Sequence, residues 1–235
     1  ARSESSVVRF YQFLGFTGYH DFKVSLATEV GGRTFYHSYE DIGSGDSVLT
    51  VKDKLFAGAA KTLEQNARTL NDEALSQAVE IIAGAKRIIL VGFAVSAAVA
   101  YDAYFKFTRL GYVCHFSTDA HINAVALSKV RKGDVLLVFS HSGETRDAIV
   151  PIRQARPTAK VVSITGARES SLARTSDVTL VTTSEERNYG TDALVSRVVQ
   201  MVLVAVVYTA VALKRGEHLT AELQQSRRSL SYLKF

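Results

Sequence analysis

The sequence predicts an α/β fold with a five-stranded, parallel, doubly wound sheet over roughly residues 75–215. Five short apolar runs rich in β-branched residues alternate there with helical patterns. Continuous apolar strands are typical of a parallel sheet whose two faces are both covered by helices. The composition, 47% hydrophobic and 22% charged, is that of a globular chain with a packed core.

The N-terminal part of the chain is expected to be helical. Residues 3–15 should form a helix, because Ser3 is a good N-cap and Gly15 can supply a left-handed stop. Its apolar stripe at helical spacing consists of Val7, Phe10, Phe13 and Leu14. A second short helix is expected from residue 20 to about 30. Residues 31–50 are rich in Gly, Ser, Asp and aromatic residues without a clear period, which indicates a linker.

Further along the chain, two more helices precede the sheet. Helical patterns resume at about 51–70 and 71–83, and the period then changes to that of strands. The five strands are expected at 87–92, 112–116, 134–139, 160–165 and 177–181. In this architecture ligands bind at the carboxyl ends of the strands, so the residues after each strand are the first place to look for a site.

The most apolar stretch, residues 198–213, lies within a helix expected over 192–213. It is shorter than the roughly 20 residues that a membrane span needs, so we expect a helix of the core or of a subunit interface. A lone cysteine, Cys114, and an N-terminus without the layout of a signal peptide add to this picture. The sequence therefore predicts a soluble, cytoplasmic protein that has no membrane partner. Its net charge of +5 weakly favours an anionic binding partner.

The six residues after the third strand suit a phosphate. They read Ser140-His-Ser-Gly-Glu-Thr145, and a helix follows. The hydroxyls of Ser140, Ser142 and Thr145 can donate to phosphate oxygens. Gly143 lets the backbone come close, and the next helix offers free N–H groups. Serine and threonine also cap helices, but three hydroxyls around a glycine exceed what a cap requires.

The end of the first strand, Gly92-Phe-Ala-Val-Ser96, is a second candidate contact. It has one glycine and misses the G-x-G-x-x-G pattern, so a nicotinamide cofactor is not expected. The sequence indicates no other cofactor. Ser96 begins the next helix and is either a second ligand hydroxyl or a helix cap.

These two strand ends together resemble the SIS (sugar isomerase) fold of phosphosugar isomerases and of RpiR-type transcriptional regulators. In that fold an S-x-S-G-x-T loop, here Ser140–Thr145, holds the sugar phosphate, and a G-x-G-x-S turn ends the first strand. Ala94 stands where that turn has its second glycine. The resemblance implies these ligand contacts: Gly92, Ser96, Ser140, Ser142, Gly143, Thr145 and, after the fifth strand, Glu185.

More of the chain matches the RpiR branch. Three segments resemble its T-D-A-H, S-P-L-A-R and S-R-x-x-Q stretches: Asp119–His121, Ser170–Arg174, and Ser196-Arg197 with Gln200. Where the family often has an arginine before the last of these, this chain has Gly190-Thr191. Residues 3–23 are similar to the family's S-E-x-T-V-V-R-F-x-x-x-L-G-F-x-G-Y-x-D-L-K segment, which ordinary SIS isomerases lack.

That N-terminal segment implies a DNA-binding module. The chain begins at about the recognition helix of a helix-turn-helix, so the resemblance implies a partial module over 1–30, a linker over 31–50 and the SIS domain with flanking helices over 51–235. The expected DNA contacts are Ser5, Ser6 and Arg9 in the groove and Lys23 on phosphate.

Three functions remain open: a sugar-phosphate-responsive regulator, an SIS isomerase or related enzyme, and a binding module without its own output. Isomerisation needs a general base, and Glu185 and Glu186 follow the fifth strand where similar isomerases carry one. The two glutamates would equally suit a solvated loop. His121 could instead cap a helix, and the side chain of His141 could point away from the phosphate. The N-terminal helices favour a non-catalytic sensor, working as a homodimer or homotetramer with residues 192–213 and 217–235 at its interface.

Overall fold

The computed structural model describes residues 4–16, 22, 25, 42–43, 45–184, 194–216 and 218–232. The chain forms two compact units. The first comprises Ala1–Lys54 and Arg187–Thr191, and the second comprises Leu55–Glu186 and Asp192–Phe235.

In the first unit, helix α1 spans Glu4–Phe13 and confirms the expected N-terminal helix. Gly15, with φ +85°, lies just beyond its end, as its left-handed role predicts. The ring of Phe22 packs edge-on against Phe10 at 5.8 Å and Phe16 at 5.4 Å between centroids. The predicted cap Ser3 and most of the predicted helix over 20–30 lie outside the described residues.

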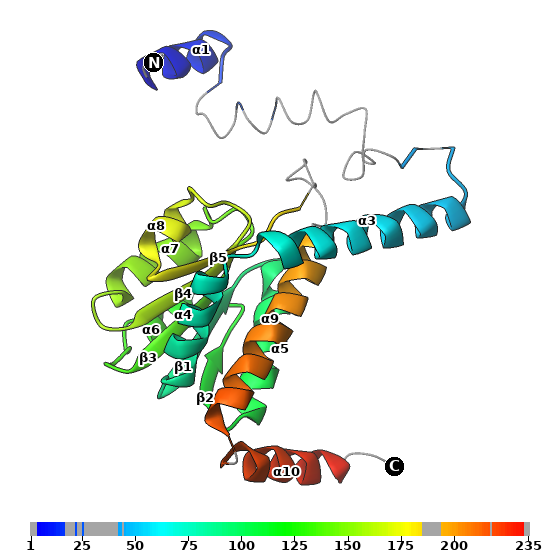
Figure 1. Cartoon of the computed structure of the whole chain (residues 1–235). Coiled ribbons are helices and arrows are strands. Elements are labelled where there is room, and N and C mark those ends of the chain that lie inside the picture. Colours follow the sequence, from blue (N-terminus) through cyan, green and yellow to red (C-terminus); the bar gives the residue numbers. More distant parts are fainter. Residues whose placement is uncertain are drawn as a thin grey trace. The chain divides into compact units, whose positions relative to one another are not determined.

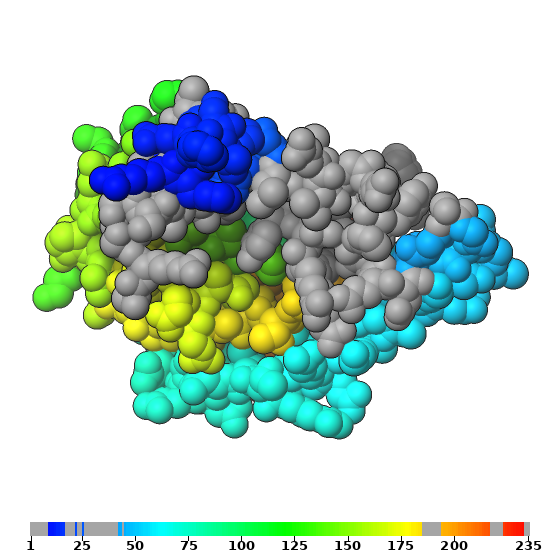
Figure 2. All heavy atoms as spheres, turned by 90° about the horizontal axis from the view of Figure 1, so that it is seen from above, coloured from blue at the N-terminus to red at the C-terminus, as the bar shows by residue number. Residues whose placement is uncertain are grey.

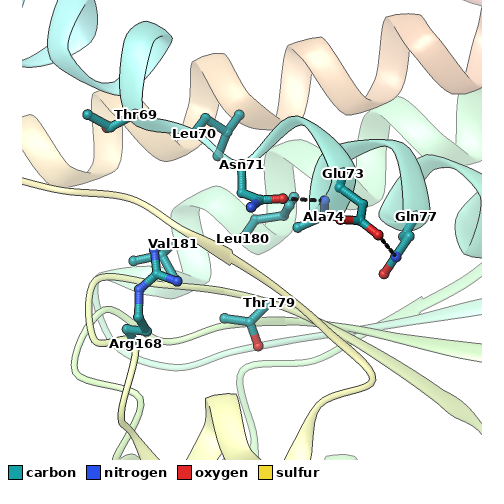
Figure 3. Close-up of a pocket in the computed structure, with 10 residues that line it drawn as sticks. All are labelled: Thr69, Leu70, Asn71, Glu73, Ala74, Gln77, Arg168, Thr179, Leu180 and Val181. Carbon is teal, nitrogen blue, oxygen red and sulfur yellow. Dashed lines mark hydrogen bonds between the residues drawn. The ribbon is translucent and has the colours of Figure 1, made fainter.

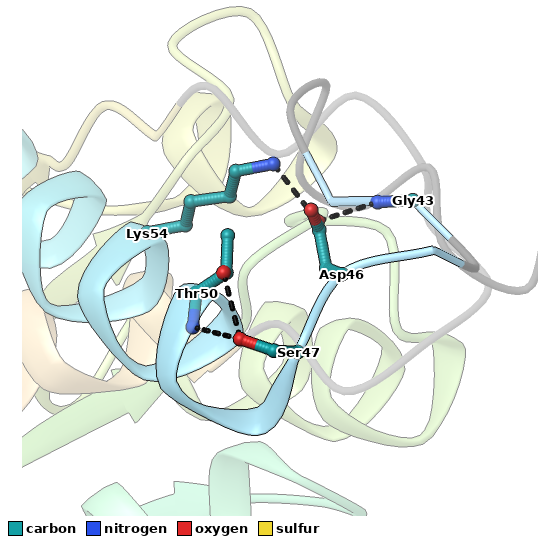
Figure 4. Close-up of polar contacts among 5 residues, drawn as sticks. All are labelled: Gly43, Asp46, Ser47, Thr50 and Lys54. Atoms are coloured by element: carbon teal, nitrogen blue, oxygen red, sulfur yellow. Dashed lines mark hydrogen bonds and ion pairs between the residues drawn. The ribbon is translucent and has the colours of Figure 1, made fainter.

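Helix α3, Val48–Thr69, begins three residues earlier than the pattern indicated. Its start is fixed by side chains, because the hydroxyl of Ser47 accepts a hydrogen bond from the Thr50 N–H at 3.1 Å. The Asp46 carboxylate accepts from the Gly43 N–H and the Lys54 ammonium, both at 2.8 Å (Figure 4). Lys54 and that N–H together hold the pKa of Asp46 below its ordinary value.

The second unit contains the predicted sheet (Figure 1). All five strands are present and parallel, in the order β2-β1-β3-β4-β5. Their bounds are β1 Arg87–Gly92, β2 Val113–Phe116, β3 Asp134–Phe139, β4 Lys160–Thr165 and β5 Val178–Val181. The helices are α4 Asp72–Ala83, α5 Ser96–Arg109, α6 Ala120–Leu127, α7 Arg146–Ala155, α8 Ser171–Thr175, α9 Leu194–Arg215 and α10 His218–Ser231. Thus the predicted fold class is confirmed.

The sheet is the middle layer of three. Alternate strand residues face opposite sides, so Ile88 and Leu90 pack with the helices α4, α5 and α9, whereas Ile89 and Val91 pack with α6, α7 and α8. Figure 1 shows the same division of the helices. Because both faces are covered, the strands need continuous apolar runs, which is the signal that identified them.

Helix α9 has two unlike sides. One side is buried against α4 and α5, and its members are Val195, Ser196, Val199, Gln200, Leu203, Val204, Val207 and Val211. The other exposes apolar side chains, among them Met201, Val202 and Val206. At 22 residues with a mean hydropathy of 2.0 over its most apolar part, α9 is long and apolar enough to cross a membrane by composition alone. Since 44% of that part is buried within the fold, we interpret α9 as a core helix.

Candidate functional site

The strand order brings the ends of β1 and β3 together at the point where that order reverses. The chain moves from β1 to β2 on one side of the sheet and returns to β3 on the other, so the order reverses between these two strands. Ligands of doubly wound sheets bind at such a reversal, beyond the carboxyl ends of the strands. Gly92 and Phe139, the last residues of β1 and β3, are register partners. The two segments predicted to hold the ligand therefore start side by side.

The Ser140–Thr145 segment forms a closed loop held by its own hydroxyls. Ser140 is buried, and its Oγ lies 3.0 Å from Thr145 Oγ1 and accepts a hydrogen bond from the Gly143 N–H at 3.2 Å. The hydroxyl of Ser142 accepts from the Glu144 N–H at 3.2 Å. All three predicted hydroxyls thus lie within one turn of chain. Thr145 occupies the N-cap position of α7 but makes no side-chain cap bond, so capping does not explain it.

Gly143 is required at the bend of this loop. Its φ is +64°, a conformation that favours glycine. A Cβ built there would lie 2.1 Å from the hydroxyl oxygen of Ser170 and 3.0 Å from that of Thr165. The loop is therefore pressed against the residues that follow β4, and the Gly143 carbonyl accepts a hydrogen bond from the Leu172 N–H at 3.0 Å.

Free backbone donors gather where the loop enters α7. Within the described part of the chain, the N–H groups of Ser142, Thr145, Arg146 and Asp147 donate no hydrogen bond. Unpaired N–H groups at the start of a helix carry a partial positive charge and suit an anion. Glu144 turns aside, because its carboxylate accepts the Ser171 N–H at 2.7 Å. That hydrogen bond is the main cause that lowers the pKa of Glu144.

The opposite wall is the turn after β1. Gly92 allows close contact, because a Cβ there would lie 2.8 Å from the Ser96 carbonyl oxygen and 2.9 Å from Ala100 Cβ. Ala94, at the position where the resembling turn has glycine, has φ +48° and is the one non-glycine residue with positive φ in the described segments. Ser96 is buried and begins α5, but Val95 occupies the N-cap. The capping alternative for Ser96 is therefore not met.

Three histidines near the strand ends belong to three different elements. His141 is half-buried in the loop, and its ring lies beside Gly166, where a Cβ would be 2.6 Å from His141 Cε1. His121 is exposed in α6, and the capping role considered for it is wrong, because Asp119 caps that helix by accepting from the Ile122 N–H at 2.9 Å. His115 lies within β2, and its pKa is lowered mainly by burial and to a smaller extent by the nearby charge of Arg87.

The remaining predicted contacts are placed less completely. Glu185, Glu186 and Lys23 lie outside the described residues. Ser5, Ser6 and Arg9 all belong to α1, and Arg9 is exposed to solvent. Four groups that support the loop had no assigned role: Glu144, Thr165, Ser170 and Ser171. Ser170 and Ser171 belong to the S-P-L-A-R-like segment, so their position in a matched motif was the one available signal.

A cavity of about 280 Å³ lies beside the carboxyl ends of β4 and β5 (Figure 3). It is lined by Thr69, Leu70, Asn71, Glu73, Ala74, Gln77, Arg168, Thr179, Leu180 and Val181. None of these is a predicted ligand contact. Asn71 is committed to capping α4, since its Oδ1 accepts the Ala74 N–H at 2.7 Å, and Gln77 donates to Glu73 at 3.2 Å. The cavity is thus distinct from the Ser140–Thr145 loop.

Comparisons with known proteins agree with the fold. The SIS domain family matches residues 81–210. An uncharacterized HTH-type transcriptional regulator of Thermotoga maritima is 39% identical over 235 residues, covering 100% of this chain and 84% of the relative. The Vibrio vulnificus NanR protein complexed with ManNAc-6P has a similar structure, with a TM-score of 0.82 and 24% identity over 98% of this chain and 82% of that one. The sugar isomerase domain of the RpiR transcription factor from Sphaerobacter thermophilus gives a TM-score of 0.67 and 23% identity over 76% and 98%.

Proposed function

This chain belongs to the SIS-domain family of HTH-type transcriptional regulators, the RpiR type that its sequence resembles, and on that premise we propose that it binds a phosphorylated sugar without converting it. The observation that carries the proposal is the Ser140–Thr145 loop. Three hydroxyls and the unpaired N–H groups of Thr145, Arg146 and Asp147 converge at the reversal point of the sheet. Such a set of donors recognises a dianionic phosphate.

The sugar part of the ligand extends toward the turn after β1. Ser96 supplies a hydroxyl there, and Gly92 keeps the wall close to the sheet. Glu185 is the proposed contact after β5, by analogy with the family. The NanR protein of similar fold forms a complex with ManNAc-6P, which supports an aldose or amino-sugar phosphate as the class of effector.

The output of the sensor is DNA binding. Ser5, Ser6, Arg9 and Lys23 are the proposed contacts, with Arg9 exposed on α1 and available to a groove. The family assignment, and not the modest net charge, supports this role. A DNA-binding regulator operates in the cytoplasm, and the domain division proposed from the sequence assigns residues 1–30 to the DNA module.

The regulator is proposed to act as a homodimer or homotetramer. The outward side of α9 exposes Met201, Val202 and Val206, and neighbouring α5 exposes Tyr101 and Phe105. Contiguous exposed apolar side chains on two adjacent helices are typical of a subunit interface. A second copy of the chain is the proposed occupant of this face.

The first experiment tests the phosphate loop by replacing Ser142 with alanine. Sugar phosphates from a panel of hexose, pentose and amino-sugar phosphates are first ranked by thermal shift, and calorimetry then measures the affinity of the best one. Loss of a donor to a charged group should weaken binding about ten- to a hundredfold. Ser128→Ala removes a hydroxyl that bonds only the Val125 carbonyl in α6 and should bind like the wild type. Equal affinity in the two variants would refute the loop assignment.

A second experiment separates the sensor from an isomerase. The protein is incubated with the bound sugar phosphate in deuterated buffer, and NMR follows proton exchange at C2. We expect no exchange, because a sensor needs no proton transfer. Exchange that disappears when Glu185 and Glu186 are both replaced by glutamine would establish the isomerase, since loss of a general base removes about 10²–10⁴ in rate.

A further inference from the structure

The Ser140–Thr145 loop is joined to the end of β4 by hydrogen bonds that involve no predicted ligand contact. The His141 carbonyl accepts from the Gly166 N–H at 2.9 Å and from the Thr165 hydroxyl at 3.1 Å. Thr165 is the last residue of β4 and is fully buried. A shift of the loop backbone at His141 therefore changes the position of the Thr165 side chain or breaks its hydrogen bond.

Thr165 also accepts a hydrogen bond from the segment that follows β5. The Thr182 N–H donates to the Thr165 carbonyl at 2.9 Å, one residue beyond the last register pair of the two strands. Thr182 is 2% exposed, so water does not compete for this bond. The backbone of residues 182–183 is thus positioned by the end of β4.

The next residue, Thr183, is held by Asn66 of helix α3. Thr183 donates its N–H to Asn66 Oδ1 at 2.8 Å, and its carbonyl accepts from Asn66 Nδ2 at 2.7 Å. This reciprocal pair joins residues 117 positions apart in the chain. Asn66 Nδ2 also donates to the Thr62 carbonyl at 2.8 Å, which uses its second donor and fixes the side chain on α3. In Figures 1 and 2 the yellow segments near β5 lie directly beside the turquoise end of α3 and α4.

Asn66 matters to α3 because few other residues of this helix are buried. Within α3, Thr62 and Asn66 are the two residues that are buried, and both are polar. The helix is therefore attached near its C-terminal end by directional hydrogen bonds more than by apolar packing. Such bonds hold at one geometry and fail when a partner moves, whereas apolar contacts tolerate small shifts.

We propose that Asn66 is the positioning residue through which anion binding at the Ser140–Thr145 loop is transmitted to α3, by way of His141, Thr165 and Thr182–Thr183. The inference rests on the proposed function, because it requires that the loop bind a phosphate. α3 starts in the first unit and ends in the second, so a change in its attachment acts on the start of the segment that leads back to residues 1–30, the part proposed to bind DNA. A chain of hydrogen bonds with a defined contact at each step can carry such coupling, and measured coupling is what establishes it.

The test uses hydrogen–deuterium exchange of the whole chain with inorganic phosphate as the probe. Saturating phosphate should slow the exchange of amides in residues 55–69 of the wild type about fivefold or more. In Asn66→Ala this response should vanish, while phosphate still raises the melting temperature. Thr165→Val removes the hydroxyl donor at the other end of the relay and should also abolish the response.

The matched control is Asn71→Ala. Asn71 lies at the same helix junction and also bonds a backbone N–H, but it is outside the relay, so this variant should respond like the wild type. If Asn66→Ala does not fold, Asn66→Asp keeps the size and the acceptor but cannot donate to Thr183, and it too should lose the response. No thermal shift with phosphate in the wild type would refute the phosphate site and the relay together. A thermal shift without any change in α3, or an Asn66 variant that keeps the response, would overturn the relay alone.

Discussion

Replacing Gly143 with alanine tests whether the loop depends on close packing at its bend. The positive φ costs alanine about 1–2 kcal/mol. The new Cβ would also lie 2.1 Å from the Ser170 hydroxyl, which is buried and caps α8 by accepting the Ala173 N–H. Ser170 must move, and loss of its cap adds about 1 kcal/mol. The sum, about 2–3 kcal/mol, is a large part of the 5–15 kcal/mol that stabilises a typical domain.

The assay is urea denaturation of the variant beside Gly133→Ala. Gly133 also has positive φ, at +98°, but the atoms nearest to a Cβ there belong to the flexible Lys86 side chain, at 3.0 Å and beyond. The free energy of unfolding of this control should therefore fall only by the cost of the positive φ, about 1–2 kcal/mol, and its affinity for phosphate should be unchanged. Gly143→Ala should lose more stability and also bind phosphate weakly. If the two variants agree within about 0.5 kcal/mol and both bind phosphate, the packing argument is wrong.

Three further predictions follow from single contacts. Ala94→Gly should raise the free energy of unfolding by about 0.5–1 kcal/mol in urea, because glycine tolerates the φ of +48° that alanine resists. The Ser171 N–H holds the pKa of Glu144 below its ordinary value, so this carboxylate stabilises the fold above the unfolded pKa of about 4.3 and that contribution disappears as the pH falls through the lower folded pKa. Glu144→Gln should therefore weaken the loss of thermal stability on acidification below about pH 4.3, and an unchanged profile would refute this. Val202→Glu places a charge on the exposed side of α9 and should dissociate the assembly in sedimentation experiments, whereas a monomeric wild type would exclude the interface.

The fold could be predicted because its determinants are local in the sequence. The segment 134–139 is buried along its whole length, and such a strand needs an uninterrupted apolar run that is visible without any partner. The end of α1 is equally local, since Gly15 alone supplies the left-handed stop. The hydroxyls of Ser140, Ser142 and Thr145 were identifiable because they lie within six residues between a strand and a helix.

What the sequence did not reveal depends on distant partners. The pairing of Asn66 with Thr183 joins two polar residues 117 positions apart, and no local sequence pattern around either residue predicts it. Glu144 had no assigned role, and its support of the loop became visible only through its hydrogen bond to the Ser171 N–H. Ala94 adopts a left-handed conformation in the turn between β1 and α5, although alanine itself prefers a right-handed backbone, so its residue type did not indicate it.

A sugar phosphate bound at the proposed site would link the lifetime of the protein to the concentration of that metabolite, through the uncapped start of α7. Thr145 turns its hydroxyl toward Ser140, so a bound phosphate would complete the first turn of a helix that the protein leaves without a side-chain cap. A ligand that binds only the folded form adds about 2.7 kcal/mol at a concentration one hundred times its Kd. Proteolysis of open forms falls in proportion to their population. Cells rich in the sugar phosphate would therefore contain more of this regulator, in addition to changing its DNA binding.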